Sequence, residues 1–226
     1  VVGTASGTSL IYLNQGGTSP FDGAQGFPLG SEGSATSSIA IGDIDRDGDL
    51  DIVEGNQGSA TRWYSNDREL TPFSGAMGTL LDDSSLDTRG THLADLNGDG
   101  WLDLVEINQD GSGKVFLNQR QPPFLSSASS HSFGSAANQV RNDVFADFNR
   151  DGDPDLLELH GSSDLHMRPH AGTHLGVNEL NVTNLPEPPG KQTALVIEDF
   201  DMDGSEDLIL VHRDAPPILY LRNNTT

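Results

Sequence analysis

Cysteine is absent from the 226 residues, which excludes disulfide bonds, thiolate metal sites and a cysteine nucleophile. Aromatic residues are scarce at 6%, and no apolar run approaches the roughly 18 residues of a transmembrane helix, so membrane insertion is not expected. Basic residues number 12 against 34 acidic ones, and the net charge of −22 argues against nucleic acid or anionic membranes as partners. The 26 glycines and 12 prolines are instead typical of many short strands joined by tight turns.

The acidic residues are concentrated in four short windows that repeat along the chain. Each window has the pattern D-x-[DN]-x-D-G-x-x-D, and the windows begin at Asp43, Asp95, Asp147 and Asp199, a constant step of 52 residues. We name them loop 1 (43–51), loop 2 (95–103), loop 3 (147–155) and loop 4 (199–207), and we number the positions within each loop from 1 to 9. Periodicity of this length indicates one structural unit per copy.

Apolar residues recur in register around the loops and predict the strands of each unit. One apolar position precedes each loop, an apolar pair follows it, and a third apolar run comes later. A Pro-Phe signal, at Phe21, Phe73 and Phe124, is expected to open a fourth segment. Three or four short strands in a unit of this size are typical of a propeller blade, so we predict an all-β fold, a β-propeller of four-stranded blades.

The repeat divides the chain into five segments. They are an N-terminal half repeat, 1–38, three repeats, 39–90, 91–142 and 143–194, and a C-terminal partial repeat, 195–226, which contains the fourth loop. A single blade cannot bury both faces of its sheet, whereas stacking against its neighbours buries them. We therefore expect one propeller domain or a segment of one.

The loops have the composition and spacing of calcium sites. Calcium takes 6–8 oxygen ligands, which side chains at positions 1, 3, 5 and 9 and the backbone carbonyl of position 7 can supply, and glycine at position 6 permits the positive φ of a tight turn. The predicted ligands are Asp43, Asp45, Asp47, Asp49 and Asp51; Asp95, Asn97, Asp99, Trp101 and Asp103; Asp147, Asn149, Asp151, Asp153 and Asp155; and Asp199, Asp201, Asp203, Ser205 and Asp207. We expect about four Ca²⁺ ions per chain, bound more tightly in loops 1 and 4, which have an aspartate where loops 2 and 3 have an asparagine.

Two other interpretations of the loops are disfavoured. Acidic turns without a metal would leave three or four carboxylates of each loop in mutual repulsion. An EF-hand matches the spacing, because Glu54, Glu106 and Glu158 stand at position 12, but strand-like runs flank the loops and Leu210 replaces the glutamate after loop 4. Since these glutamates repeat in register, we expect each to have a structural role and not to form a catalytic carboxylate pair.

The fourfold loop resembles the FG-GAP/VCBS repeat of integrin α-chain propellers and of many secreted bacterial and fungal proteins, and the resemblance covers essentially the whole chain. It implies calcium in the loop between the first two strands of each blade. It also implies an extracellular role in adhesion, carbohydrate recognition or scaffolding. Members of the family usually close with more blades than this chain provides.

We therefore expect an extracellular, calcium-binding propeller that acts as a non-enzymatic recognition or adhesion module, with a glycan or an extracellular protein as its partner. One alternative is a structural subunit of an extracellular assembly, and another is a propeller part of a polysaccharide-active enzyme. No Ser-His-Asp set, HExxH motif or phosphate-binding glycine loop can be picked out, so catalytic residues are not predicted.

Four further features have weaker signals. Trp101, at the variable position 7, is a candidate for stacking on a sugar if its side chain points outward, whereas Trp63 is expected in the core. A polar loop is expected at His166, His170 and His174, because Pro169 and Gly172 break any helix; low-affinity transition-metal binding, with His160 nearby, is the alternative. The N-glycosylation acceptor motif begins at Asn181, Asn223 and Asn224.

The two ends of the sequence lie at different phases of the repeat. Residues 1–14 align without gaps with 53–66, so the sequence begins in mid-blade, which predicts a processed protein or a fragment. The fourth unit stops after its third strand, and open strand edges invite pairing. We expect the strand near Phe21–Leu29 to complete the blade begun by Leu195–Leu221, either as a clasp within one chain or as strand exchange in a homo-oligomer.

Overall fold

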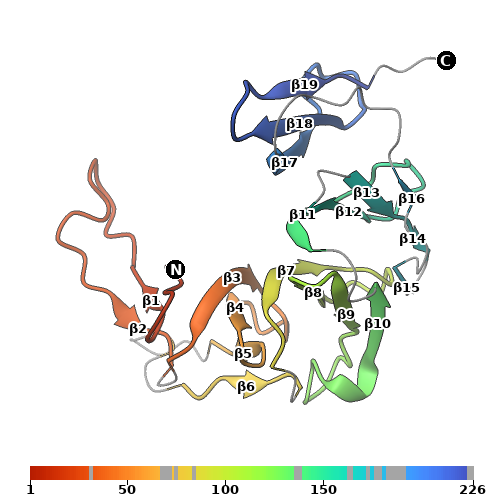
Figure 1. Ribbon diagram of the computed structural model, residues 1–226. Helices are drawn as coiled ribbons and strands as arrows, with labels where there is room; N and C mark the ends of the chain where they lie inside the picture. Colours follow the sequence, from red (N-terminus) through yellow and green to blue (C-terminus); the bar gives the residue numbers. More distant parts are fainter. Residues whose placement is uncertain are drawn as a thin grey trace. The chain divides into compact units, whose positions relative to one another are not determined.

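The computed structural model describes residues 1–30, 33–66, 73, 76–82, 85–134, 139–161, 165–171, 174–175, 180–181 and 192–222. In this part of the chain all regular structure is β-strand, apart from one 3₁₀ turn at Ser127–Ser129, which confirms the predicted all-β class (Figure 1). No helix among these residues is long and apolar enough to cross a bilayer.

The strands recur at equivalent positions of the repeat. First strands are β3 (Ala35–Gly42), β7 (Thr88–Ala94), β11 (Val140–Ala146) and β17 (Gln192–Glu198). Second strands are β4 (Asp51–Gln57), β8 (Asp103–Asn108), β12 (Asp155–His160) and β18 (Asp207–His212). Third strands are β1 (Leu10–Ile11), β5 (Arg62–Tyr64), β9 (Ser112–Phe116), β13 (Leu165–Arg168) and β19 (Ile218–Tyr220). Fourth strands are β2 (Phe27–Pro28), β6 (Thr79–Leu80), β10 (Ser130–Gly134) and β16 (Leu180–Asn181). A separate hairpin pairs β14 (His170–Ala171) with β15 (His174–Leu175).

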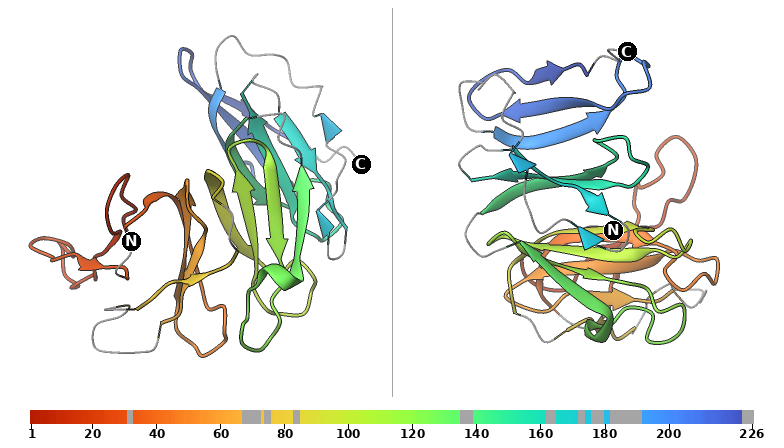
Figure 2. Two further views of the ribbon diagram at one scale, coloured as in Figure 1. Left: turned by 60° about the horizontal axis from the view of Figure 1, so that its bottom comes forward. Right: turned by 90° about the vertical axis from the view of Figure 1, so that its right-hand side faces the viewer.

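Each repeat forms a sheet in which sequential strands are neighbours. The orders are β3-β4-β5-β6, β7-β8-β9-β10, β11-β12-β13-β16 and β17-β18-β19, with β1-β2 as a separate pair. The first two strands of each sheet are antiparallel and have the same register throughout, for example Ala40 opposite Val53 and Val144 opposite Leu157 (Figures 1 and 2). A bulge recurs at the same place in all four pairs. This is the strand order of a propeller blade.

The chain divides into two compact units. Unit 1 comprises Val1–Asp95, Asp99–Asn108 and Phe116–Ser130, and unit 2 comprises Leu96–Gly98, Gln109–Val115 and His131–Thr226. The second strands form the centre of each core: β8 and β12 are buried at every position, because they have a strand on either side and cover on both faces. Trp63 is 7% exposed and packs in the core of unit 1, as predicted.

The fourth strands do not begin at the Pro-Phe signal. They begin six residues after it, at Phe27, Thr79 and Ser130. Phe73 instead lies in a turn with a positive φ of 62°, and its carbonyl accepts a hydrogen bond from the N–H of Ala76 at 3.1 Å. Since Phe73 is 8% exposed, the aromatic residue anchors the turn before the strand and does not start the strand itself.

The N-terminal strand that was expected to complete the fourth unit has a partner in its own half repeat. β2 pairs with β1 in the N-terminal half repeat, where Leu10 lies opposite Pro28 and Ile11 opposite Phe27. In the described part of the fourth repeat, β19 is an edge strand of a three-stranded sheet. Closing the short connection between β1 and β2 costs less chain entropy than joining segments from the two ends of the sequence. Pairing of this strand with the fourth unit, within one chain or between chains, stays a prediction.

Candidate calcium loops

Each loop connects the first strand of its sheet to the second, which is where the resemblance placed calcium (Figure 1). The predicted glycine turn is present in all four loops, with φ values of 92°, 84°, 95° and 82° at Gly48, Gly100, Gly152 and Gly204. Position 4 also has a positive φ in every loop, at Arg46, Gly98, Arg150 and Met202. Only Gly98 signalled this second turn in the sequence, because the other three residues rarely adopt a positive φ.

The same two hydrogen bonds fold every loop back on itself. The position 1 aspartate accepts a hydrogen bond from the backbone N–H of the position 6 glycine, at distances of 2.7–3.2 Å in the four loops. The position 5 aspartate accepts one from the N–H of position 7, at 2.8–3.0 Å. Backbone N–H groups therefore hold two of the predicted ligands in each loop at fixed places.

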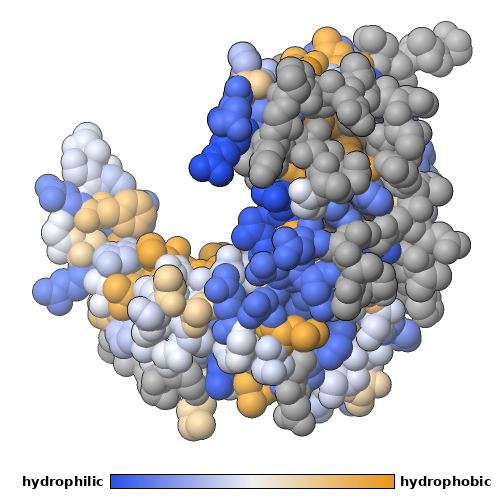
Figure 3. Space-filling view, viewed as in Figure 1, coloured by the Kyte–Doolittle hydropathy of each residue, from blue (hydrophilic) through white to orange (hydrophobic). Residues whose placement is uncertain are grey.

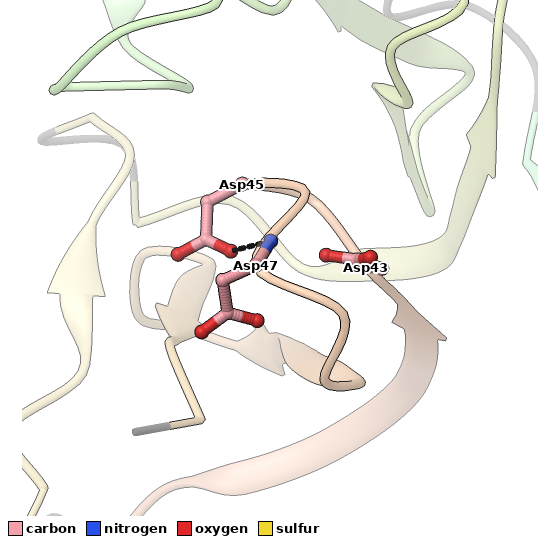
Figure 4. Close-up of side chains that lie close together, drawn as sticks. All are labelled: Asp43, Asp45 and Asp47. Atoms are coloured by element: carbon pink, nitrogen blue, oxygen red, sulfur yellow. Dashed lines mark hydrogen bonds between the residues drawn. The ribbon is translucent and has the colours of Figure 1, made fainter. Parts of the chain in front are cut away.

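The carboxylates of loops 1 and 4 converge. Ligand oxygens of Asp43, Asp45 and Asp47 lie within 4.8 Å of one another (Figure 4). In loop 4 the corresponding group is Asp199, Asp201 and Asp207. Three carboxylates at this separation repel one another unless protons or a cation neutralise them, and a hard divalent cation with oxygen ligands suits both groups.

In loops 2 and 3, other side chains of the protein form ion pairs or hydrogen bonds with the aspartates. In loop 2, Arg120 pairs with Asp99, with distances of 2.9 Å from Nε and 2.8 Å from Nη2 to Oδ2. In loop 3, the Asn149 amide donates hydrogen bonds to Asp151 at 2.8 Å and to Asp155 at 3.2 Å. A calcium ion would have to displace these interactions, whereas the Asp45 carboxylate of loop 1 faces other acids.

The position 9 aspartate has a second role that the sequence analysis missed. All four are fully buried, and each accepts a hydrogen bond at 2.8–3.0 Å from the backbone N–H of the residue 15 positions later, just beyond the third strand. The donors are Asn66, Asn118, His170 and Arg222. The other oxygen of Asp51 accepts from the N–H of Ile44 at 2.9 Å, so this side chain joins the loop to the third strand. The constant spacing of 15 residues was the available signal.

Burial changes the acidity of these groups. It raises the pKa of Asp51 to about 6, against the opposing effect of hydrogen bonds from Asn66 and Ile44, and it raises the pKa of Asp155. Burial also raises the pKa of Asp45, with a further contribution from the neighbouring Asp47 and Asp43. In the calcium-free protein the pKa values of these three carboxyl groups therefore lie above their ordinary value.

A pH dependence follows for the calcium-free protein. Because the folded state of Asp51 keeps its proton to about pH 6 and the unfolded chain loses it near pH 4, ionisation of this group disfavours the folded state as the pH rises between these values. Lowering the pH from about 7 to about 5 in chelator is expected to increase the free energy of unfolding, by about 1.3 kcal/mol from this group. Urea unfolding at both pH values measures this, and Asp51→Asn is expected to reduce the difference. Equal stability of the native chain at the two values would contradict the shift.

Trp101 does not have the free, outward side chain that was expected. It is half-buried, its ring stacks on Phe124 at 6.1 Å between centroids and 18° between planes, and the Arg46 guanidinium lies 4.9 Å from the ring centroid. The ring of Phe124 also meets Trp63 edge-on at 5.8 Å. Position 7 can vary in sequence because its predicted ligand is the backbone carbonyl. In loop 2 the side chain at this position packs between the loop and Phe124 of the core.

The three position 12 glutamates are buried structural groups, as expected. Glu54 is 2% exposed and accepts hydrogen bonds from Ser9 at 2.5 Å, Thr36 at 2.6 Å and Tyr64 at 3.2 Å. In the next repeat, Glu106 is 1% exposed, and Thr61 and Thr88 occupy the places of Ser9 and Thr36. The two hydroxyl-bearing residues are therefore repeated in the sequence together with the glutamate.

In the third repeat the buried glutamate has a different hydrogen-bond donor. Gly113 and Val140 stand where Ser9 and Thr36 stand in the first, and neither carries a hydroxyl. Arg168 takes over, donating from Nε to Glu158 at 2.7 Å, and both side chains are fully buried. After loop 4 the glutamate is replaced by Leu210, which packs in the core of unit 2. The third repeat thus keeps the glutamate with a different donor, and the fourth repeat lacks the glutamate.

The histidines do not form the polar loop that was expected. His166 lies in β13, and its ring stacks on that of His160 at 4.2 Å between centroids, while His170 in β14 is 2% exposed. His174 lies in β15. No described histidine belongs to a group of three ligands close enough to hold a metal. His160 lies 3.5 Å from the carboxylate of the buried Glu158–Arg168 pair. This pair gives the buried His160 a polar neighbour.

Of the three glycosylation motifs, one begins within the described residues. Asn181 belongs to β16, whereas Asn223 and Asn224 lie outside the described residues.

Comparison with known proteins identifies the repeat. A family model described as FG-GAP-like repeat matches residues 1–54 and 95–158. This chain belongs to the FG-GAP-like repeat family. Cartilage acidic protein 1 of Xenopus tropicalis is 31% identical over 188 residues, covering 78% of this chain and 29% of that protein. Cartilage acidic protein 1 of Homo sapiens is 29% identical over 223 residues, covering 93% and 32%. The FG-GAP chain thus spans about a third of the length of these relatives.

Solved structures with little sequence similarity share the fold of this FG-GAP chain. A structure of BBS1N in complex with ARL6DN matches 99% of the chain with a TM-score of 0.61 and 14% identity. Raptor from Chaetomium thermophilum matches 96% with a TM-score of 0.57 and 16% identity. At this identity the likeness concerns the fold alone.

Proposed function

We propose that this chain is a segment of a calcium-loaded β-propeller that acts outside the cell as a non-enzymatic recognition or adhesion module. The observation that carries the proposal is the shared geometry of the four loops, in which the same two backbone hydrogen bonds hold the predicted ligands of each loop. In loops 1 and 4 three carboxylates also lie close enough to share one cation. Oxygen donors of this kind and number suit calcium better than a transition metal.

The propeller part of the proposal is supported by the sheets. Sequential antiparallel strands, an identical register in every repeat and second strands buried on both faces are features of stacked blades. The ions would sit in the loops between first and second strands, where Asp51 and its equivalents already join each loop to the third strand. Calcium would thus stiffen one end of every blade.

An extracellular location is supported by the chemistry of the loops and by the relatives. Exposed acidic loops of this type need the high calcium concentration outside the cell if their affinity is modest, with dissociation constants of about 10⁻⁴–10⁻³ M for extracellular modules. Relatives named for cartilage and for acidity fit a chain with a net charge of −22. Hydrophilic side chains cover much of the face shown in Figure 3. The partner we propose is a glycan or an extracellular protein.

Calorimetric titration with calcium is the first test. We expect about four ions per chain, because each loop has a complete set of oxygen ligands in sequence. Asp43→Ala is expected to remove one ion, and Asp214→Ala, an exposed acid outside the loops, is expected to remove none. A wild-type chain that takes up no calcium would refute the proposed function.

A second measurement separates the modes of action. Binding to immobilised glycans in calcium, lost in chelator, supports recognition of carbohydrate. A polymeric mass in solution without glycan binding favours the structural subunit of an assembly. Turnover of polysaccharides would overturn the non-enzymatic assignment.

A further inference from the structure

The arginine at position 4 of loops 1 and 3 reaches the loop that follows. Arg46 places its guanidinium 4.9 Å from the ring centroid of Trp101, and a Cβ added at Gly100 would lie 2.7 Å from its Nη2. Arg150 donates a hydrogen bond to the carbonyl of Gly204 at 2.9 Å and another to the Ser205 hydroxyl. The contacted residues are positions 6 and 7 in both cases, so two loops of different sequence receive the same contact.

A second contact runs in the opposite direction within each pair. The Asn118 amide, just beyond the third strand of the second repeat, donates to the carbonyl of Ile44 at 2.9 Å. Arg222, the equivalent residue of the fourth repeat, donates to the carbonyl of Phe148 and lies 5.2 Å from its ring centroid. Both acceptors are at position 2 of the preceding loop. Loops 1 and 2 are thus joined in both directions, and so are loops 3 and 4.

We propose that the arginine at position 4 lowers the calcium affinity of the following loop, so that the loops act as two unequal pairs. This inference rests on the proposed calcium function. A guanidinium beside an empty loop offsets the repulsion among its carboxylates, and once calcium binds, the same charge repels the ion. A unit charge several Å from a divalent ion in water changes its affinity by about three- to tenfold.

The inference alters the order of affinities that carboxylate number alone predicts. Loop 4 has one carboxylate more than loop 3, but it is contacted by Arg150 from position 4 of loop 3. Loop 3 has no such contact, because position 4 of the preceding loop is Gly98, which has no side chain. Loop 2 receives Arg46 and also pairs its Asp99 with Arg120 at 2.8 Å. We therefore expect loop 2 to bind calcium most weakly of the four and loop 4 to lose its advantage over loop 3.

The test replaces the arginine with the residue that loop 4 itself carries. Met202 occupies position 4 with a φ of 60°, so Arg46→Met keeps a side chain that this backbone accepts. Calcium titration of the full chain at low salt is expected to show one site tightened about three- to tenfold, and high salt is expected to reduce the difference by screening. Arg213→Met, which removes an exposed arginine outside the loops, is the matched control and is expected to change no site.

A second background assigns the effect to loop 2. In Asp99→Ala, where loop 2 is disabled, Arg46→Met is expected to lose the tightening of the loop 2 site, and any shift that remains belongs to loop 1, which contains Arg46. Arg46→Gln serves as a second uncharged variant if the methionine chain does not fold. Unchanged or weaker binding in the folded Arg46 variants would overturn the inference while leaving the proposed calcium function intact. Absence of calcium uptake by the wild-type chain would refute both.

Discussion

Chelating calcium is expected to lower the melting temperature of this chain by about 10 °C. A ligand at ten times its dissociation constant stabilises the folded state by about 1.4 kcal/mol per site, and each kcal/mol shifts the midpoint of a unit half the length of this chain by about 4 °C. We take two ions for each cooperative unit, since the chain has two compact units. The physical cause is the set of carboxylates within 4.8 Å of one another, which calcium neutralises and which otherwise repel.

Differential scanning calorimetry in millimolar calcium and in chelator measures this shift. Magnesium at the same concentration is expected to restore much less stability, because it keeps its waters and demands octahedral geometry. Asp99→Ala, which disables loop 2 alone, is expected to show a smaller loss than chelation, since repeat proteins sum the stabilities of their units. A melting temperature that chelator leaves unchanged would contradict the calcium assignment.

The features that the sequence predicted best are those that need one residue type at one place. Glycine at position 6 was predicted from the turn it permits, and its φ values confirm that turn in all four loops. The first two strands followed from apolar pairs such as Ile52-Val53, because residues buried on both faces leave a continuous apolar signal. Local backbone requirements and burial both leave a trace in composition, and the repeat multiplies that trace fourfold.

The features that the sequence did not predict depend on contacts between distant residues. The fourth strand β6 has only two residues, Thr79 and Leu80, both exposed, so neither apolar alternation nor length marks it. Trp101 was expected to point outward because position 7 varies, but no pattern in the sequence indicates that Arg46 and Phe124 contact its ring. The positive φ of Arg46 and Arg150 was hidden by a residue type that rarely adopts it.

The buried glutamates show how the repeat tolerates change within a fixed fold. Hydroxyl groups donate hydrogen bonds to Glu54, an arginine pairs with Glu158, and in the fourth repeat a leucine replaces the glutamate. A glutamate at position 12 is therefore not required for the loop, and its effect on stability depends on the donors around it. Removing the donor while the buried glutamate stays is therefore expected to lower the free energy of unfolding strongly.

Removing the charge of Arg168 is accordingly expected to destabilise unit 2 by about 3–5 kcal/mol, because Arg168→Met leaves the Glu158 carboxylate buried without its cation. Replacing both residues, Glu158→Leu with Arg168→Tyr, copies Leu210 and Tyr220 of the fourth repeat and is expected to recover most of the loss. Arg120→Met breaks an exposed ion pair, with 58% of the arginine side chain accessible, and should cost less than about 1 kcal/mol in chelator. Urea unfolding of the four chains measures these differences. A small effect of Arg168→Met, or a double variant less stable than the single one, would contradict the role given to the buried pair.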